Sequence, residues 1–272
     1  MGLLVGIVIG LVLGLTGAGG SVFAVPLLIL LLGLPVQQAI GISLGAVFVS
    51  ALFGVFTHLK SKQILWLPAI VFSVLGGAFA PVGGWIGRQI SEPVLMIGFG
   101  VLVVLIATRM WTQAVKNPED SSIVRASKPN SDDPATAICR INNNQRFKLG
   151  LPCILGVSGG AIVTGILSGL FGVGGGFMII PTLIYLTGIG MKQAVATSLV
   201  VISVISATGF SSFLMAGNEI STSVLMWVAI GGILGMLVSI GAGKKIAGPS
   251  LQKAFSILML LMAGIILAKQ FL

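Results

Sequence analysis

The same glycine-rich stretch occurs twice in this chain, each time between apolar segments. GLTGAGGSVFAVP runs from Gly14 to Pro26, and GLFGVGGGFMIIP runs from Gly169 to Pro181, 155 residues later. The alignment continues without a gap from 14–54 onto 169–209, where sixteen of forty-one positions are identical. Glycine costs roughly 1 kcal/mol per position in a helix relative to alanine, so this repetition needs a structural reason. It indicates an internal duplication.

The solvent of this chain is lipid rather than water. Hydrophobic residues make up 56% of the sequence and charged residues only 8%, whereas a soluble domain carries about 25% charged residues. The net charge is +9, and the basic residues lie at the ends of apolar segments and in one loop. They form no basic patch interleaved with aromatic residues, so we expect no nucleic-acid partner. Cys139 and Cys153 form no CxxC motif, and we read the N-terminus, which lacks a basic n-region, as mature structure.

Ten apolar segments, five in each half, are separated by one polar loop. The third, fourth and fifth of each half are long enough to span a bilayer, which needs roughly 20 residues. The pieces flanking the first glycine cluster, and the one after the second, are too short, so we expect broken or re-entrant helices there. The segments are 2–15, 20–32, 36–57, 64–87 and 93–115, then 150–170, 175–188, 191–215, 221–243 and 250–271.

The predicted fold is an all-α polytopic membrane protein with 8–10 membrane segments. Residues 1–115 form the first transmembrane repeat, 116–148 a polar cytoplasmic loop, and 149–272 the second repeat. An odd number of segments per half inserts the second repeat upside down, as in many secondary transporters. If segments alternate sides, the loop and most bases share the cytoplasmic side, with both termini outside. Those bases are Lys60, Lys62, Arg109, Lys192, Lys244, Lys245 and Lys253, whereas Arg88 and Lys269 lie opposite.

The two glycine turns are the candidate substrate site. In an inverted repeat they enter from opposite faces, and both can end near the midplane. Glycine permits left-handed backbone angles, and the helix after each turn presents free N–H groups that bind anions. Close helix packing is the alternative role for such glycines. The predicted binding residues are Gly17, Gly19, Gly20, Ser21, Gln38, Ser43, Gly172, Gly174, Gly175, Gly176, Gln193 and Ser198, with Pro26 and Pro181 as hinges.

The ionisable residues argue for an anion and against several other functions. All six acids lie in or beside loops, whereas proton relays and cation sites use ionisable groups inside the membrane. We therefore expect no metal and no cofactor. The only histidine, His58, lies beside Lys60 and Lys62, as an interfacial residue would. The string from Gly156 to Gly160 matches the G-x-S-x-G pattern around Ser158, but a transmembrane helix offers no nucleophile elbow, so a serine hydrolase is the least favoured alternative.

The paired stretches GLTGAGGSVFAVPLL and GLFGVGGGFMIIPTL, followed by QQAIGISL and KQAVATSL, resemble the sulfite exporter TauE/SafE family. The resemblance covers nearly the whole chain. It implies an inner-membrane permease, not an enzyme, for sulfur-containing anions such as sulfite, sulfoacetate or related organosulfonates, often in the exporting direction. An anion channel is the alternative. In either case we expect the protein's partners to be the bilayer and a small anion, and a homo-oligomer is compatible with the sequence.

Overall fold

The chain folds almost entirely into helices. The computed structural model describes residues 1–17, 19–59, 63–116, 140–141, 147–148, 151–187, 191–218, 220–246, 256–262 and 264–265. Its helices confirm the all-α polytopic prediction, and their bounds follow the predicted segments closely. They are α1 Gly2–Thr16, α2 Gly19–Leu32, α3 Val36–Leu59, α4 Trp66–Gln89, α5 Glu92–Lys116, α6 Leu151–Phe171, α7 Gly176–Thr187, α8 Met191–Met215 and α9 Thr222–Ile246, followed by a short helix at 256–262.

Two parts of the chain differ from the prediction or lie outside the described residues. The predicted polar loop contains a two-residue antiparallel pairing, in which β1 (Arg140–Ile141) faces β2 (Phe147–Lys148). The apolar residues Ile141 and Phe147 face each other in this pairing, a contact too short to be recognised by hydrophobic periodicity. The rest of the loop at 117–139 and 142–146, and most of the last predicted segment at 250–271, lie outside the described residues.

Four helices in the described part of the chain are long and apolar enough to cross a bilayer: α3, α4, α8 and α9. Six segments were expected to qualify. The helix α5 is 25 residues long and is apolar over Glu92–Thr108, and most of the fifth segment of the second half lies outside the described residues. The helices α1, α2 and α6 are apolar as well, so the chain is a multi-pass membrane protein.

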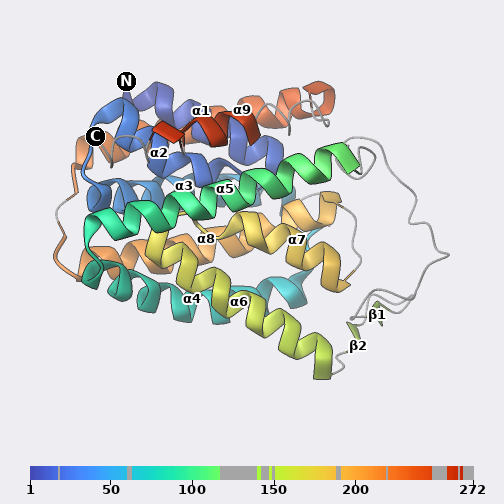
Figure 1. Cartoon of the computed structure of the whole chain (residues 1–272). Coiled ribbons are helices and arrows are strands. Elements are labelled where there is room, and N and C mark those ends of the chain that lie inside the picture. Colours follow the sequence, from blue (N-terminus) through green and yellow to red (C-terminus); the bar gives the residue numbers. More distant parts are fainter. Residues whose placement is uncertain are drawn as a thin grey trace.

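The four tryptophans lie on the outer surface in two groups, one at each end of the helix bundle. Trp66 is the first residue of α4 and Trp111 lies near the end of α5, and Figure 1 shows this start of α4 and this end of α5 at the right-hand end of the bundle. Trp85 and Trp227 lie near the opposite helix ends, and all four side chains are 40–55% exposed. Along α4, Trp66 and Trp85 are about 28 Å apart, close to the roughly 30 Å hydrocarbon thickness of a bilayer. This distribution matches the aromatic belts of membrane proteins.

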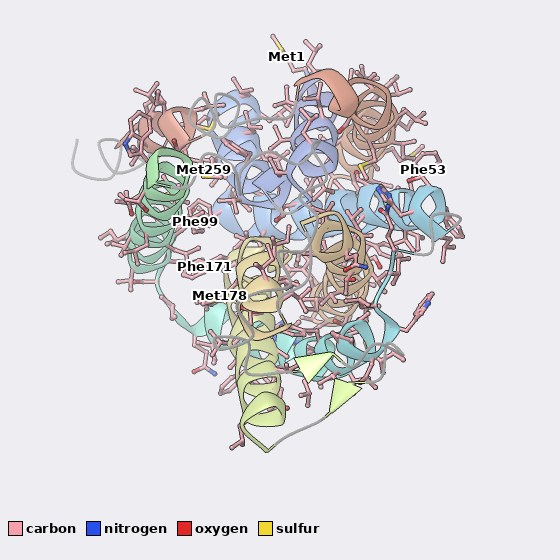
Figure 2. All side chains as sticks on the ribbon, turned by 90° about the vertical axis from the view of Figure 1, so that its right-hand side faces the viewer. Met1, Phe53, Phe99, Phe171, Met178 and Met259 are labelled. Carbon is pink, nitrogen blue, oxygen red and sulfur yellow. The ribbon has the colours of Figure 1, made fainter. Side chains whose placement is uncertain are left out.

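Glycine allows two pairs of helices to pack backbone to backbone. In the first pair, α1 runs alongside α9, with Gly6 and Gly10 against Val228 and Gly232. In the second pair, α6 runs alongside α4, with Gly169 against Ala80. Each pair joins one helix from each half, and the view along the bundle in Figure 2 shows the helices of the two halves interleaved. Small residues permit this close approach, which is the usual basis of helix association in membranes.

The central helices α3 and α8 cross the middle of the bundle in opposite directions. Gly41 packs against Phe213, Gly45 against Phe210, and Gly54 against Leu199, so residue numbers rise on one helix as they fall on the other. About two thirds of the apolar window of α3 and half of that of α8 are buried. Figure 1 shows them enclosed by the remaining helices. The two glycine turns pack against this central pair.

Replacing Gly169 by alanine is expected to lower the thermal unfolding temperature in detergent, because the added Cβ would overlap the carbonyl oxygen of Ala80. The matched control is Gly159→Ala on the same helix, where nothing lies within 4 Å of the added atom. That control should unfold at or slightly above the wild-type temperature, since alanine favours helix. Equal unfolding temperatures for the two variants would contradict the close packing of α6 and α4.

Candidate functional site

Each half of the chain contains a helix hairpin that turns at glycine. Gly17 ends α1 with φ +70°, and Gly172 follows α6 with φ +69°. Gly174 and Gly175 also have positive φ, +67° and +70°. Residues that carry a side chain rarely adopt these left-handed backbone angles, whereas glycine adopts them without steric cost. The glycine clusters are therefore the turns predicted from the sequence.

The two turns are joined to the central helices by a crossed pair of hydrogen bonds. The hydroxyl of Ser43 on α3 donates to the carbonyl oxygen of Gly172 at 2.7 Å. The hydroxyl of Ser198 on α8 is within donating distance of two carbonyl oxygens, that of Gly17 at 3.1 Å and that of Val195 in its own helix at 2.9 Å. Both bonds to the glycine turns are buried. Because Ser198 and Gly172 are the repeat counterparts of Ser43 and Gly17, each half holds the turn of the other by the same contact.

The apolar contacts around the turns are reciprocal as well. A Cβ on Gly17 would lie 2.6 Å from Val195 of α8, and one on Gly172 would lie 2.9 Å from Ile40 of α3. Ile40 and Val195 are again repeat counterparts. Since the close approach coincides with positive φ, any side chain at either glycine is both strained and crowded.

The second turn reaches the middle of the bundle. A Cβ on Gly174 would lie 3.1 Å from Val47 and 3.4 Å from Ile202, which are near the midpoints of α3 and α8. The Ser206 hydroxyl oxygen would be 3.0 Å from the same position. Gly174 therefore lies at mid-height between the two central helices.

Three buried hydroxyls without a hydrogen-bond partner surround this second turn. Thr164, Ser168 and Ser206 are at most 1% exposed, and their oxygens make no hydrogen bond. Thr164 and Ser168 lie one helical turn apart on α6, and a Cβ on Gly175 would overlap the Thr164 methyl group and lie 3.6 Å from the Ser168 Cβ. None of the three was predicted from the sequence, because the predicted polar site residues were chosen on and after the glycine turns, whereas Thr164 and Ser168 precede the second turn and Ser206 reaches it from α8.

Two comparisons with known proteins identify the family. Residues 2–266 match the family described as sulfite exporter TauE/SafE. The chain belongs to the TauE/SafE family. This TauE/SafE protein is 28% identical over 256 residues to a probable membrane transporter protein of Xylella fastidiosa, a match that covers 92% of this chain and 87% of the relative.

More distant organisms have relatives of the same description. A probable membrane transporter protein of Methanocaldococcus jannaschii is 26% identical, with 80% of this chain and 73% of the relative covered. A probable membrane transporter protein of Bacillus subtilis is 25% identical, with 87% of this chain and 86% of the relative covered. No solved structure matches at the same level of significance. The protein is thus a membrane transporter and not an enzyme, and the family name is the only indication of substrate.

The remaining predicted site residues of this TauE/SafE protein divide into two groups. Gly20, Ser21 and Gly176 are buried at the starts of α2 and α7, beside the turns, and Gly19 is the first residue of α2. Gln38 and Gln193 are half-buried in the first turns of α3 and α8, five residues before the serines that bind the glycine turns. The glutamines therefore lie toward the bundle ends. Pro26 and Pro181 lie inside α2 and α7.

Other polar residues near the predicted site have structural partners. Thr197, next to Ser198, accepts a hydrogen bond from the Leu65 backbone N–H at 3.1 Å and so holds the start of α4. A ring nitrogen of His58 lies 3.0 Å from the Gly54 carbonyl oxygen in the last turn of α3. Ser158 lies inside the continuous helix α6, so the G-x-S-x-G string forms no strand-to-helix elbow and the hydrolase alternative is wrong.

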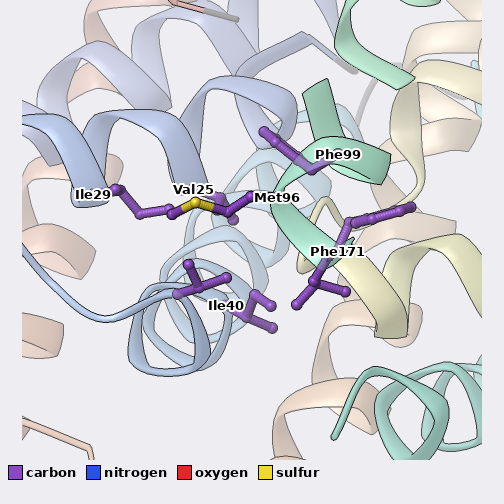
Figure 3. A pocket seen from close by; sticks show the side chains of 8 residues that line it. Val25, Ile29, Ile40, Met96, Phe99 and Phe171 are labelled. Atoms are coloured by element: carbon purple, nitrogen blue, oxygen red, sulfur yellow. The ribbon is translucent and has the colours of Figure 1, made fainter. Parts of the chain in front are cut away.

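An apolar pocket lies between α2, α3, α5 and the end of α6 (Figure 3). Phe99 and Phe171 meet beside it with ring centroids 5.8 Å apart. Figure 3 shows only carbon and sulfur atoms on the side chains around it. Because an anion needs hydrogen-bond donors, this pocket offers it nothing.

Replacing Gly172 by alanine is expected to abolish transport, because the side chain would be strained at positive φ and would press on Ile40. Gly33→Ala is the matched control, since Gly33 has φ +64° with nothing within 4 Å. Both variants carry a similar backbone cost of roughly 1–2 kcal/mol. Flux in proteoliposomes at equal protein content should be lost in Gly172→Ala and kept in Gly33→Ala. Similar flux in the two variants would mean that crowding at the turn does not affect transport.

Proposed function

We propose that this protein is a permease that moves a small sulfur-containing oxyanion, such as sulfite, sulfoacetate or a related organosulfonate, across the inner membrane. The observation that carries the proposal is the crossed pair of serine–glycine hydrogen bonds, which holds two glycine turns inside the bundle. Backbone that is not helical at membrane depth is tolerated only where it is buried in protein or lines a cavity. Helix starts at that depth offer amide donors and a positive dipole end to an anion.

The two halves act as inverted repeats in this proposal. The helices α1 and α6 are repeat counterparts, and so are α4 and α9. The pairing of α1 with α9 then corresponds to that of α6 with α4. The antiparallel crossing of α3 and α8 supports inversion, since these two helices are counterparts as well. Transporters built this way alternate access by moving one unit against another around a fixed site.

The orientation follows from the positive charges. In Figure 1 the ends of α5 and α9, which carry Lys116, Lys244 and Lys245, lie at the same end of the bundle as β1 and β2, whereas Met1 lies at the other end. We place the basic end in the cytoplasm, as positively charged loops favour, and the N-terminus outside. With the cell interior negative, moving one charge is worth about 2.3 kcal/mol per 100 mV. The membrane potential alone therefore drives export of an anion.

An anion channel is the second candidate, and saturation distinguishes it from a permease. A permease binds substrate in each cycle, so its flux saturates and shows counterflow. Purified protein in proteoliposomes loaded with radiolabelled sulfite or sulfoacetate should give saturable efflux that a potential, negative inside, accelerates. Flux that stays linear with concentration would favour the channel, and absence of flux for both anions would contradict the proposed substrate class.

Gly19→Leu and Gly174→Leu are expected to remove this flux, because each places a large side chain in a glycine turn. Gly159→Leu is the control, since nothing in the protein lies within 4 Å of that position. Monodisperse elution in detergent should show that the variants fold. If Gly19→Leu and Gly174→Leu both fold and transport at the wild-type rate, the glycine turns are not the site.

A further inference from the structure

The two glycine turns occupy equivalent places in the repeat but differ in backbone and in surroundings, since Gly174 and Gly175 have positive φ and their counterparts Gly19 and Gly20 begin helix α2. Gly20 and Gly175 are repeat counterparts, and a Cβ on either would contact the preceding helix at equivalent positions. In the first half these positions are Ile9 and Leu13, and in the second half they are Thr164 and Ser168. The packing positions are the same in both halves, whereas the residues at them change from apolar to hydroxyl-bearing.

The central helix repeats this difference. Ser206, whose hydroxyl oxygen approaches Gly174, has Ala51 as its counterpart on α3. Ile9, Leu13 and Ala51 are all completely buried. Three apolar side chains in the first half therefore correspond to three buried hydroxyls in the second, all of them near a glycine turn.

These hydroxyls lack the hydrogen bonds that buried polar groups normally make. Serine and threonine in membrane helices usually donate to a carbonyl of the preceding turn, as Ser203 does to Val200 on the same helix as Ser206. Thr164, Ser168 and Ser206 do not. Two other buried hydroxyls in the described part of the chain also lack a partner, Ser239 beside Gly14 and Ser73 on α4. Only the second turn brings three together.

The start of α7 adds backbone donors to the same place. The amides of Met178 and Ile179 donate to the Gly175 carbonyl oxygen, which leaves Gly176 and Phe177 without an acceptor inside the helix. The helix is twelve residues long, so its N-terminal end carries a partial positive charge. Hydroxyl and amide donors around one positive helix end suit a compact anion with several acceptor oxygens.

We propose that the oxyanion binds at the second glycine turn alone, held by Thr164, Ser168 and Ser206 and by the amides at the start of α7, and that the first turn is a structural element. This inference rests on the proposed function. It assigns binding to one of the two turns that the repeat relates, so the site is asymmetric although the fold is a repeat. The ligand class is a small oxyanion with at least three exposed oxygens, which sulfite and organosulfonates share.

The test compares the concentration dependence of sulfite and sulfoacetate flux in proteoliposomes for Ser206→Ala, Ser168→Ala and wild type. Each alanine variant should raise the apparent KM about tenfold with little change in maximal rate, as loss of one hydrogen bond to a charged ligand does. The ligand-free unfolding temperature should not fall, because the removed hydroxyl has no partner. Ser203→Ala is the control on the same helix and should keep the wild-type KM.

The mirror variant Ala51→Ser adds a hydroxyl at the first turn and should leave KM unchanged. An unchanged KM in both Ser206→Ala and Ser168→Ala would overturn the asymmetric site while leaving the permease function standing. An unchanged KM together with a lowered unfolding temperature would assign the hydroxyls to a structural role or to buried water, and would also overturn the asymmetric site. Wild-type protein that moves neither anion would overturn the proposed function itself.

Discussion

The crossed hydrogen bonds from Ser43 to Gly172 and from Ser198 to Gly17 are the constraint on which the arrangement depends. A helix that turns back inside a membrane leaves carbonyl and amide groups that lipid cannot satisfy, each at a cost of several kcal/mol. Here a serine hydroxyl from the opposite half donates a hydrogen bond to one carbonyl oxygen in each turn. Neither half can satisfy its own turn in this way, so the two halves must fold against each other. The backbone contacts of α1 with α9 and of α6 with α4 follow the same division.

Glycine has two separate functions in this chain. At helix crossings such as Gly169 on Ala80 it permits backbone contact, and at Gly172 it permits a left-handed turn pressed against Ile40. The first function is needed for stability and the second places helix starts inside the bundle. The proposed binding role belongs to the second turn, because three of the unpaired buried hydroxyls in the described part of the chain belong to residues that pack against it. A duplicated fold can in this way keep its symmetry of packing while one copy specialises in chemistry.

The helices and the turns could be predicted from the sequence, because both depend on local signals. Apolar runs of given length and glycine clusters located α1 to α9 within a few residues, and the repeat placed Ser43 and Ser198 in equivalent positions. Their partners could not be predicted, since a bond between residues 129 positions apart depends on how the halves pack. Gln38 and Gln193 were assigned to the site as polar residues near the turns in sequence, and they lie toward the helix ends. Ser206 was missed because it is far from the turn in sequence and approaches Gly174 only in the folded bundle.

A structure of the protein in lipid nanodiscs with selenite, the heavier analogue of sulfite, tests the central claim most directly. Selenium can be located by its anomalous scattering, which separates it from water and from sulfur at other positions. The account predicts one peak beside the second glycine turn, within hydrogen-bond distance of the Ser206 hydroxyl and of the amides that begin α7. A peak only at the first turn, a peak only in the apolar pocket beside Phe171, or no peak in protein that transports selenite would contradict it.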